Sequence, residues 1–477
     1  MIRFLSRFAA PLCVALLAGC AGWPSPPPAP ALREDVPLAG VERPGPGAGN
    51  WPDAQWWKQY RDPQLDALIA LSLRGAPTLV TAQTRFNSAL QNVRAASAAS
   101  GARVDASGTW TRQRMSDSGL IPPKFLGFHW YSQADLGLQF SYDFDWWGKQ
   151  RAVVESVVDQ VHAAEAENAT ALLTLTSAVA DTYFGWQADQ ARLALAREVV
   201  DRQLRVRDID ALRVSSGIDV PDVLQQAEGN LASSREVVAA LEGSAQLRRV
   251  VLAALAGVSP QALPDLKPAP LPRVDSRLPA NASIDLIARR PDIAASRWRV
   301  ESAARNVDAA RADFFPDISI KALAGLSAID MDKLFRAGSR VFNFGPALHL
   351  PIFDGGLIRA RYGISQADLD AAVSAYNSAL VDAAREVATQ ALTAQQIDAR
   401  RKERRAEVDA ATALRDSAGA RERQGLTDAR PTLLADAMLL QQRDGVIALD
   451  AQAVATDIAL KKSLGGGYLA AKPVNKH

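Results

Sequence analysis

Cysteine and histidine are scarce in this chain of 477 residues, which contains two Cys and four His. Two cysteines exclude a disulfide framework and any Cys-rich zinc or iron–sulfur site. The histidines are scattered and form no His-x-x-x-His pair, so the sequence offers no metal site. The chain also lacks a Gly-x-Ser-x-Gly motif and a phosphate-binding loop. We therefore expect neither an enzyme nor a bound cofactor.

An excess of charge of one sign is absent too, because 54 Lys and Arg stand against 52 Asp and Glu, a net charge of +2. This balance argues against a nucleic-acid-binding protein, which needs a basic face to meet phosphates. Long apolar runs are missing beyond the amino terminus, and the mean hydropathy is -0.07. Such values are typical of soluble proteins, but membrane β-strands alternate in polarity and give almost no hydropathy signal.

The first 19 residues have the pattern of a secretory signal peptide, with Arg3 and Arg7 before an apolar stretch. That stretch is too short for a membrane-spanning helix. It ends in Leu17-Ala18-Gly19-Cys20, which resembles the lipobox of bacterial lipoproteins and makes Cys20 the predicted site of lipidation. The alternative is an ordinary signal peptide followed by a chance cysteine. After Cys20, the chain up to residue 50 is rich in Pro and Gly, which predicts an extended leash.

The remaining chain repeats itself after about 210 residues. Residues 77–104 align with residues 291–318, an offset of 214 (291 − 77). Further along the offset becomes 208, so that Gly217 matches Gly425. We therefore predict one fold made of two similar halves rather than several unrelated domains. The predicted halves are 51–270 and 271–470, followed by a C-terminal tail at 471–477.

Each half contains two predicted β-strands. Near 134–146 and 341–353, apolar and polar residues alternate over about ten positions, as in a membrane strand with one face in lipid and one in water. Weaker partner strands are predicted near 104–112 and 317–325. An ordinary sheet hairpin in each half would give the same alternation, so the pattern alone leaves that alternative open.

Long helices follow the strands, at 151–256 in the first half and 359–464 in the second. Each segment starts with about 65 proline-free residues, which would reach roughly 100 Å at 1.5 Å per residue. Glycine-containing polar turns, Ser215–Asp219 and Gln424–Asp428, end these long helices and lead into shorter returning ones. A soluble coiled-coil hairpin would show the same periodicity.

Four membrane strands cannot close a barrel by themselves. An open sheet in lipid leaves edge N–H and C=O groups unpaired, at a cost of several kcal/mol each. About eight strands is the smallest practical membrane barrel. Three copies of the chain would supply about twelve strands, within the range seen for such barrels.

Several motifs, in order along the chain, resemble those of the bacterial outer-membrane efflux proteins, the TolC-like and NodT-type lipoproteins. The clearest is Arg-Arg-Pro-Asp-Ile within Leu286–Ile293. The other matching segments are Ser141–Gly148, Phe314–Ile318, Leu350–Gly356 and Leu464–Tyr468. The resemblance extends from about Trp56 to Tyr468, which is nearly the whole mature chain.

The resemblance implies a mainly helical TolC-like fold with a membrane β-barrel contribution. Three identical chains would form the barrel in the outer membrane and a helical tunnel in the periplasm. The implied function is a duct without chemistry or cofactor. It would pass small molecules outward from a periplasmic adaptor and an inner-membrane pump of the resistance-nodulation-division type. A duct for peptide or protein secretion is an alternative, as is a structural coiled-coil lipoprotein.

In this family the helix turns form a periplasmic mouth that hydrogen bonds and ion pairs hold closed. The candidate gate residues that correspond here are Arg213, Asp219, Asp222, Arg421, Arg423, Asp428, Arg430 and Asp436. The family often has Leu-Leu-Asp at this place, whereas this chain has an Ala between the second leucine and Asp436. One inserted residue turns the acid by about 100° around a helix, so whether Asp436 faces the lumen is open.

Overall fold

The computed structural model describes residues 30–33, 49–118, 122–279 and 288–469. The predicted signal peptide, Cys20, most of the leash and the tail at 471–477 lie outside these described residues. The chain divides into two compact units. One contains 103–152 and 303–375, and the other contains 33–102, 153–302 and 376–477.

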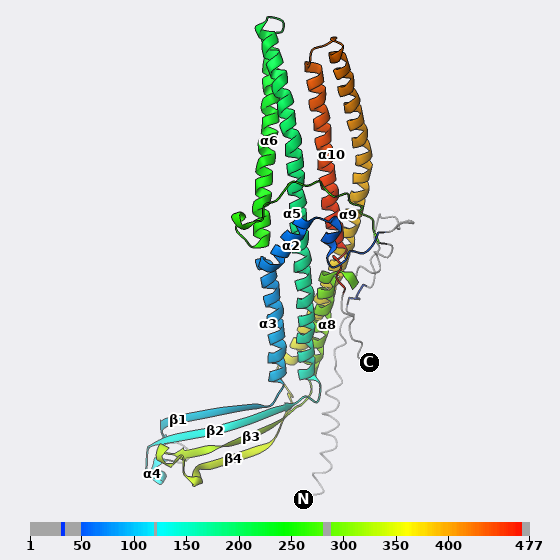
Figure 1. Cartoon of the computed structure of the whole chain (residues 1–477). Helices are drawn as coiled ribbons and strands as arrows, with labels where there is room; N and C mark the ends of the chain where they lie inside the picture. Colours follow the sequence, from blue (N-terminus) through cyan, green and yellow to red (C-terminus); the bar gives the residue numbers. More distant parts are fainter. Residues whose placement is uncertain (1–29, 34–48, 119–121, 280–287, 470–477) are drawn as a thin grey trace. The chain divides into compact units, whose positions relative to one another are not determined.

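A four-stranded antiparallel sheet dominates the first unit (Figure 1). Its strands follow one another in the order β1-β2-β3-β4, so β2 and β3 join the two halves and β1 and β4 are the edges. The strands are β1 (Arg103–Arg114), β2 (Trp130–Phe144), β3 (Asp317–Ile329) and β4 (Arg340–His349). A short helix α4 (Pro123–Leu126) lies in the β1–β2 connection, and the 3-10 turns η4 (Met331–Lys333) and η5 (Ala337–Ser339) lie between β3 and β4.

The strand ends differ from the predicted ones. β2 begins at Trp130, four residues earlier than expected, where aromatic residues favour the extended backbone. β3 continues to Ile329, four residues beyond its predicted end. Ile329 pairs with Gln133, which lies just before the predicted start of β2. β4 ends at His349, four residues before the predicted end, because Pro351 has no N–H to donate to a sheet.

The second unit is helical, and its longest helices form two antiparallel pairs, α5 with α6 and α9 with α10 (Figure 1). Both α5 and α9 continue from the sheet unit into the helical one and contain 67 residues each. They are separated by 208 residues at both ends (357 − 149 and 423 − 215), which matches the second offset of the sequence repeat. The helices are η2 (Trp56–Tyr60), α2 (Pro63–Gly75), α3 (Pro77–Ala99), α5 (Lys149–Ser215), α6 (Pro221–Ala256), η3 (Pro260–Ala262), α8 (Pro291–Ala312), α9 (Leu357–Arg423) and α10 (Arg430–Ser463).

The main core of the helical unit forms where α2 packs against the long helices. Asp62 caps α2 by accepting the N–H groups of Gln64 and Leu65, at 2.9 and 3.2 Å, and Pro63 occupies the first helical position. Asp62 also accepts the Tyr183 hydroxyl of α5 at 2.7 Å, which fixes α2 against that helix. The buried cluster includes Trp56, Trp57, Leu65, Leu68, Ile69, Val179, Tyr183, Phe184, Leu252, Val454 and Ile458.

Two described parts of the predicted leash contact the helical unit. The N–H of Arg33 donates to Asn377 Oδ1 at 3.0 Å, and the N–H of Gly49 donates to Leu278 O at 2.9 Å. These two hydrogen bonds attach described parts of the predicted leash to the helical unit.

Candidate functional site

The two long helices end in turns of the same geometry. Gly217 and Gly425 both have φ of 71°, a left-handed conformation that suits glycine and commonly follows a helix. The next residue in each turn donates its N–H back to a helical carbonyl at 2.9 Å, Ile218 to Arg213 and Leu426 to Arg421. These turns were predicted from the sequence, and they place one polar tip on each helix pair.

Arg213 links the two tips. Its guanidinium donates to both carboxylate oxygens of Asp219, at 2.6 and 3.2 Å, and to Asp428 of the second turn at 3.2 Å. The hydrogen bond from Arg213 lowers the pKa of Asp219. Arg421 is the repeat equivalent of Arg213 (213 + 208), but the residue equivalent to Asp219 is Thr427, so the second turn cannot form the same pair. Asp428 is therefore available to the first turn.

A second contact between the tips joins Arg430, at the start of α10, to Asp210 in α5. Arg430 Nε lies 2.9 Å from Asp210 Oδ1, and the Asp210 side chain is 1% exposed. Neither Asp210 oxygen accepts a hydrogen bond from the described residues. Burial raises the pKa of Asp210 despite the nearby Arg430, and the charges of Asp219 and Asp428 act in the same direction as burial.

Two more ion pairs continue along α5 and α10 away from the tips. Arg202 Nε donates to Asp436 Oδ2 at 2.6 Å, and Arg192 binds Asp444 through two hydrogen bonds of 2.8 and 3.0 Å. As residue numbers rise along α5 they fall along α10, as two antiparallel helices require. We call this set the α5–α10 ladder: Arg192–Asp444, Arg202–Asp436, Asp210–Arg430 and Arg213–Asp428.

The predicted gate residues thus fall into two groups. Arg213, Asp219, Asp428, Arg430 and Asp436 all take part in ion pairs of α5, its turn and α10. The others, Asp222, Arg421 and Arg423, have no opposite charge within ion-pair distance among the described residues. Asp436 is directed to Arg202 rather than to Arg423.

Sequence reasoning missed four members of the ladder: Arg192, Arg202, Asp210 and Asp444. These residues lie inside the long helices, where charged side chains usually decorate a solvated face. A signal was present in the sequence, because opposite charges recur at matching intervals from the two turns. Using that signal requires knowing that α5 packs against α10, which local periodicity does not reveal.

The sheet provides a second candidate site because its two faces differ in character. All three strand pairings run without a shift, so even-numbered strand residues share one face and odd-numbered ones the other. The even-numbered positions form the apolar face: Val104, Ala106, Gly108, Trp110, Trp130, Ala134, Leu136, Leu138, Phe140, Tyr142, Phe144, Ile318, Ile320, Ala322, Ala324, Leu326, Ala328, Phe342, Phe344, Pro346 and Leu348, with Ser132 and three arginines at one end. The odd-numbered positions form the polar face, which includes Asp105, Asp135, Gln139, Asp143, Asp317, Lys321 and Asn343.

Large side chains of the apolar face are uncovered in the single chain. Phe344 is 89% exposed and Phe342 is 73% exposed. On the polar face, Asp135 accepts the Ser327 hydroxyl at 2.6 Å across the β2–β3 pair. A contiguous exposed apolar surface of this kind marks contact with a membrane or a protein. In the described part of the chain, no single helix has the length and apolar character needed to cross a membrane, and one bent pair, α2 with α3, meets those two criteria.

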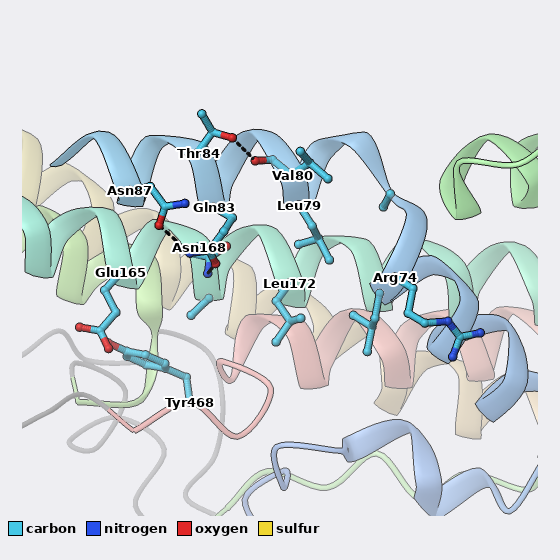
Figure 2. Close-up of a pocket in the computed structure, with 13 residues that line it drawn as sticks. Arg74, Leu79, Val80, Gln83, Thr84, Asn87, Glu165, Asn168, Leu172 and Tyr468 are labelled. Atoms are coloured by element: carbon cyan, nitrogen blue, oxygen red, sulfur yellow. Dashed lines mark hydrogen bonds between the residues drawn. The ribbon is translucent and has the colours of Figure 1, made fainter. Parts of the chain in front are cut away.

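A groove of 740 Å³ lies between α3 and α5 in the helical unit (Figure 2). Figure 2 shows Leu79 and Leu172 among its apolar residues, and Asn168 donates to Gln83 Oε1 across it at 3.4 Å. Helix α3 buries none of its 23 residues, although the equivalent helix α8 buries Ile293 and Val300. Among the residues that the structure describes, no three His, Cys, Asp or Glu side chains gather as a metal site would require.

Comparisons with known proteins agree with this architecture. The family model described as outer membrane efflux protein matches the chain twice, at residues 68–258 and 283–466. The chain is 36% identical over 455 residues to the multidrug resistance outer membrane protein MdtP of Shigella flexneri, covering 93% of this chain and 91% of that protein. It is 32% identical over 464 residues to the multidrug resistance outer membrane protein MdtQ of Escherichia coli O157:H7, covering 95% of this chain and 96% of that protein.

A solved structure gives the same result. The outer membrane protein VceC of Vibrio cholerae superimposes with a TM-score of 0.78 at 31% identity, covering 87% of this chain and 100% of that one. The two family matches correspond to the two halves of the repeat. The amphipathic sheet, the paired long helices and these similarities together establish that the chain belongs to the outer membrane efflux protein family.

Proposed function

We propose that the chain is one of three identical subunits of an outer-membrane duct for small molecules. The duct would receive its cargo from an inner-membrane pump of the resistance-nodulation-division type through a periplasmic adaptor, and would perform no chemistry. The multidrug resistance names of its relatives MdtP and MdtQ support small molecules as the cargo. Lipidation of Cys20, if the lipobox is used, would add a second membrane anchor to each subunit.

The amphipathic sheet with two unpaired edges is the observation that carries this proposal. Its apolar face suits lipid, and its polar face suits a water-filled passage. In the isolated chain, however, β1 and β4 each pair with only one neighbour. Exposed backbone groups at these edges would be costly in lipid, so β4 of one copy should pair with β1 of the next. Three chains of four strands then give about twelve strands.

The internal repeat predicts the register of this contact between copies. Within the chain, Asp135 of β2 lies opposite Ser327 of β3. Moving Asp135 forward by 208 gives Asn343 in β4, and moving Ser327 back by 214 gives Gln113 in β1. If the halves succeed one another around a common axis, Asn343 of one copy lies opposite Gln113 of the next.

Helix α3 supports the same arrangement. Its equivalent α8 packs on α5, where the Ser302 and Ser156 hydroxyls are 2.9 Å apart. The same shifts convert Ser302 to Ser88 in α3 and Ser156 to Ile364 in α9. We therefore expect α3 to be covered by α9 of a neighbouring copy, which would bury the helix that one chain leaves exposed.

The tips of the helix pairs are the proposed periplasmic mouth. The α5–α10 ladder would hold the two helix pairs of each chain together there, and its release would let them separate and widen the passage. Arg213, Asp219, Asp428, Arg430 and Asp436 are proposed gate residues on the basis of their ion pairs. Asp222, Arg421 and Arg423 remain candidates for contacts between copies.

Size and conductance measurements test the proposal together. The detergent-extracted protein, left unboiled, should migrate as a trimer that heat converts to a monomer. Added to a planar lipid bilayer, it should produce discrete ion-conducting events. A monomer or dimer without conductance would instead support the structural coiled-coil lipoprotein.

A further inference from the structure

The apolar face of the sheet carries three charged residues at one end. In β1–β4 these are Arg112, Arg114 and Arg340, and the structure describes every residue of these strands. All three are arginines, all are exposed, and all lie at the end of the sheet where the β1–β2 and β3–β4 loops connect the strands. Every other charged strand residue belongs to the polar face.

Two of these arginines have no anionic partner among the residues that the structure describes. Arg114 pairs with Asp117 at 2.9 Å. For Arg112 and Arg340, no carboxylate of the described residues lies within ion-pair distance. Arg112 instead lies over the ring of Trp130, 5.9 Å from its centre, and Trp130 is 55% exposed.

An unpaired guanidinium on a lipid-facing surface is costly at the middle of a bilayer but tolerated near its interface. The position of Arg112 and Arg340 therefore fixes the level of the lipid headgroups at the loop end of the sheet. Trp110 and Trp130, both more than half exposed, lie at this level, as aromatic residues do at membrane interfaces.

Closure between copies brings the arginines together. In the register proposed above, Phe344 lies opposite Arg112 of the next copy and Phe342 lies opposite Arg114, because each pair keeps the sum of 456 given by Asn343 and Gln113 (343 + 113). Arg340 lies two residues before Phe342 on the same face, at the start of β4. Each contact between copies would therefore gather two arginines of one chain and one of the other around two exposed phenylalanines.

We propose that this three-arginine cluster binds a phosphate-bearing lipid headgroup of the outer leaflet. The inference rests on the proposed function, because the cluster forms only at the contact between copies. Guanidinium groups bind phosphate through paired hydrogen bonds, and the flanking Phe342, Phe344 and Trp110 suit the start of the acyl chains. A trimer would contain one such site at each of its contacts between copies.

The test measures lipid affinity in the intact trimer. Purified protein is placed in nanodiscs of zwitterionic lipid, and binding of a fluorescent bisphosphorylated glycolipid is titrated. The double variant Arg112→Gln/Arg340→Gln should bind it at least ten-fold more weakly than wild type. The control Arg103→Gln/Lys321→Gln also removes two positive charges, but from the polar face, and should bind like wild type. A dephosphorylated glycolipid should bind all proteins weakly.

The proposal would be overturned by equal affinity of wild type and the Arg112/Arg340 variant, by an equal loss in the Arg103/Lys321 control, or by tight binding of the dephosphorylated lipid. Complete competition by millimolar inorganic phosphate would also overturn it, because it would indicate an anion site rather than a lipid site. Trimer size and conductance of the wild type are recorded in parallel. Failure of those two would contradict the proposed duct, whereas failure of lipid binding alone contradicts only the lipid site.

Discussion

Arg430 at the start of α10 lies 2.9 Å from Asp210 in α5, and Asp210 is almost completely buried. This ion pair connects the first half of the repeat to the second at the proposed mouth. Because Asp210 receives no hydrogen bond from the described residues, Arg430 is the group that compensates its charge most directly. The arrangement makes the mouth sensitive to the loss of a single cation.

Replacing Arg430 by alanine should favour the open mouth. The substitution leaves a buried carboxylate without its cation, which typically costs about 3–5 kcal/mol in the state that buries it. We expect Arg430→Ala to raise single-channel conductance or opening frequency in a planar bilayer. Arg405→Ala is the matched control, because Arg405 is an exposed arginine of α9 that forms no ion pair with the described residues. Equal conductance of Arg430→Ala and wild type would remove this pair from the gate.

The pH dependence of the mouth should follow Asp210. Its pKa is raised in the closed arrangement by burial, so the closed arrangement gains a proton before the open one as pH falls. Acidification from neutral pH toward that raised pKa should therefore stabilise closure and lower conductance. Asp219 acts with the opposite sign, because Arg213 lowers its pKa, but its effect appears only below the ordinary Asp range near 3.8.

The variant Asp210→Asn separates these contributions. It is neutral at all pH values and similar in shape, so it should conduct less than wild type at neutral pH and lose the response to mild acid. Conductance recorded between pH 7 and 4.5 measures both effects. If the asparagine variant still lost conductance on acidification as wild type does, the pH response would belong to a group other than Asp210.

Neighbouring residues of β4 test which face of the sheet meets lipid. Phe344 belongs to the apolar face and Asn343 to the polar face. An arginine on the lipid face costs up to about 2–4 kcal/mol, depending on its depth in the bilayer, whereas an arginine in a watery passage costs little. Phe344→Arg should therefore reduce the amount of heat-labile trimer recovered from outer membranes, and Asn343→Arg should not. Equal recovery of the two variants, or the reverse order, would refute the assignment of the faces.

The sequence was sufficient to predict the main elements of the fold. Alternating residues identified the strands, and the absence of proline identified the long helices. Gly217 and Gly425 marked the tips, because a residue with positive φ after a helix is most often glycine. These features depend on local backbone preferences, which neighbouring residues determine.

The contacts between the halves could not be predicted in this way. Asp210 and Arg430 are 220 residues apart (430 − 210), and only the packing of α5 on α10 brings them together. The same holds for Arg202 and Asp436. Strand ends were also missed, because pairing between β2 and β3 extends both strands beyond their alternating cores.

Disulfide formation between copies would show whether β4 of one copy pairs with β1 of the next in a shared sheet. Asn343→Cys and Gln113→Cys are combined in one chain, and the protein is oxidised in isolated outer membranes. We expect rapid cross-linking into covalent dimers and trimers, because the equivalent pair Asp135 and Ser327 is directly opposite within the chain. The control pairs Asn343→Cys with Thr109→Cys, four residues along the same face of β1, and should cross-link far less. Equal yields from both pairs, or monomers alone from the first, would contradict the proposed closure of β4 on β1.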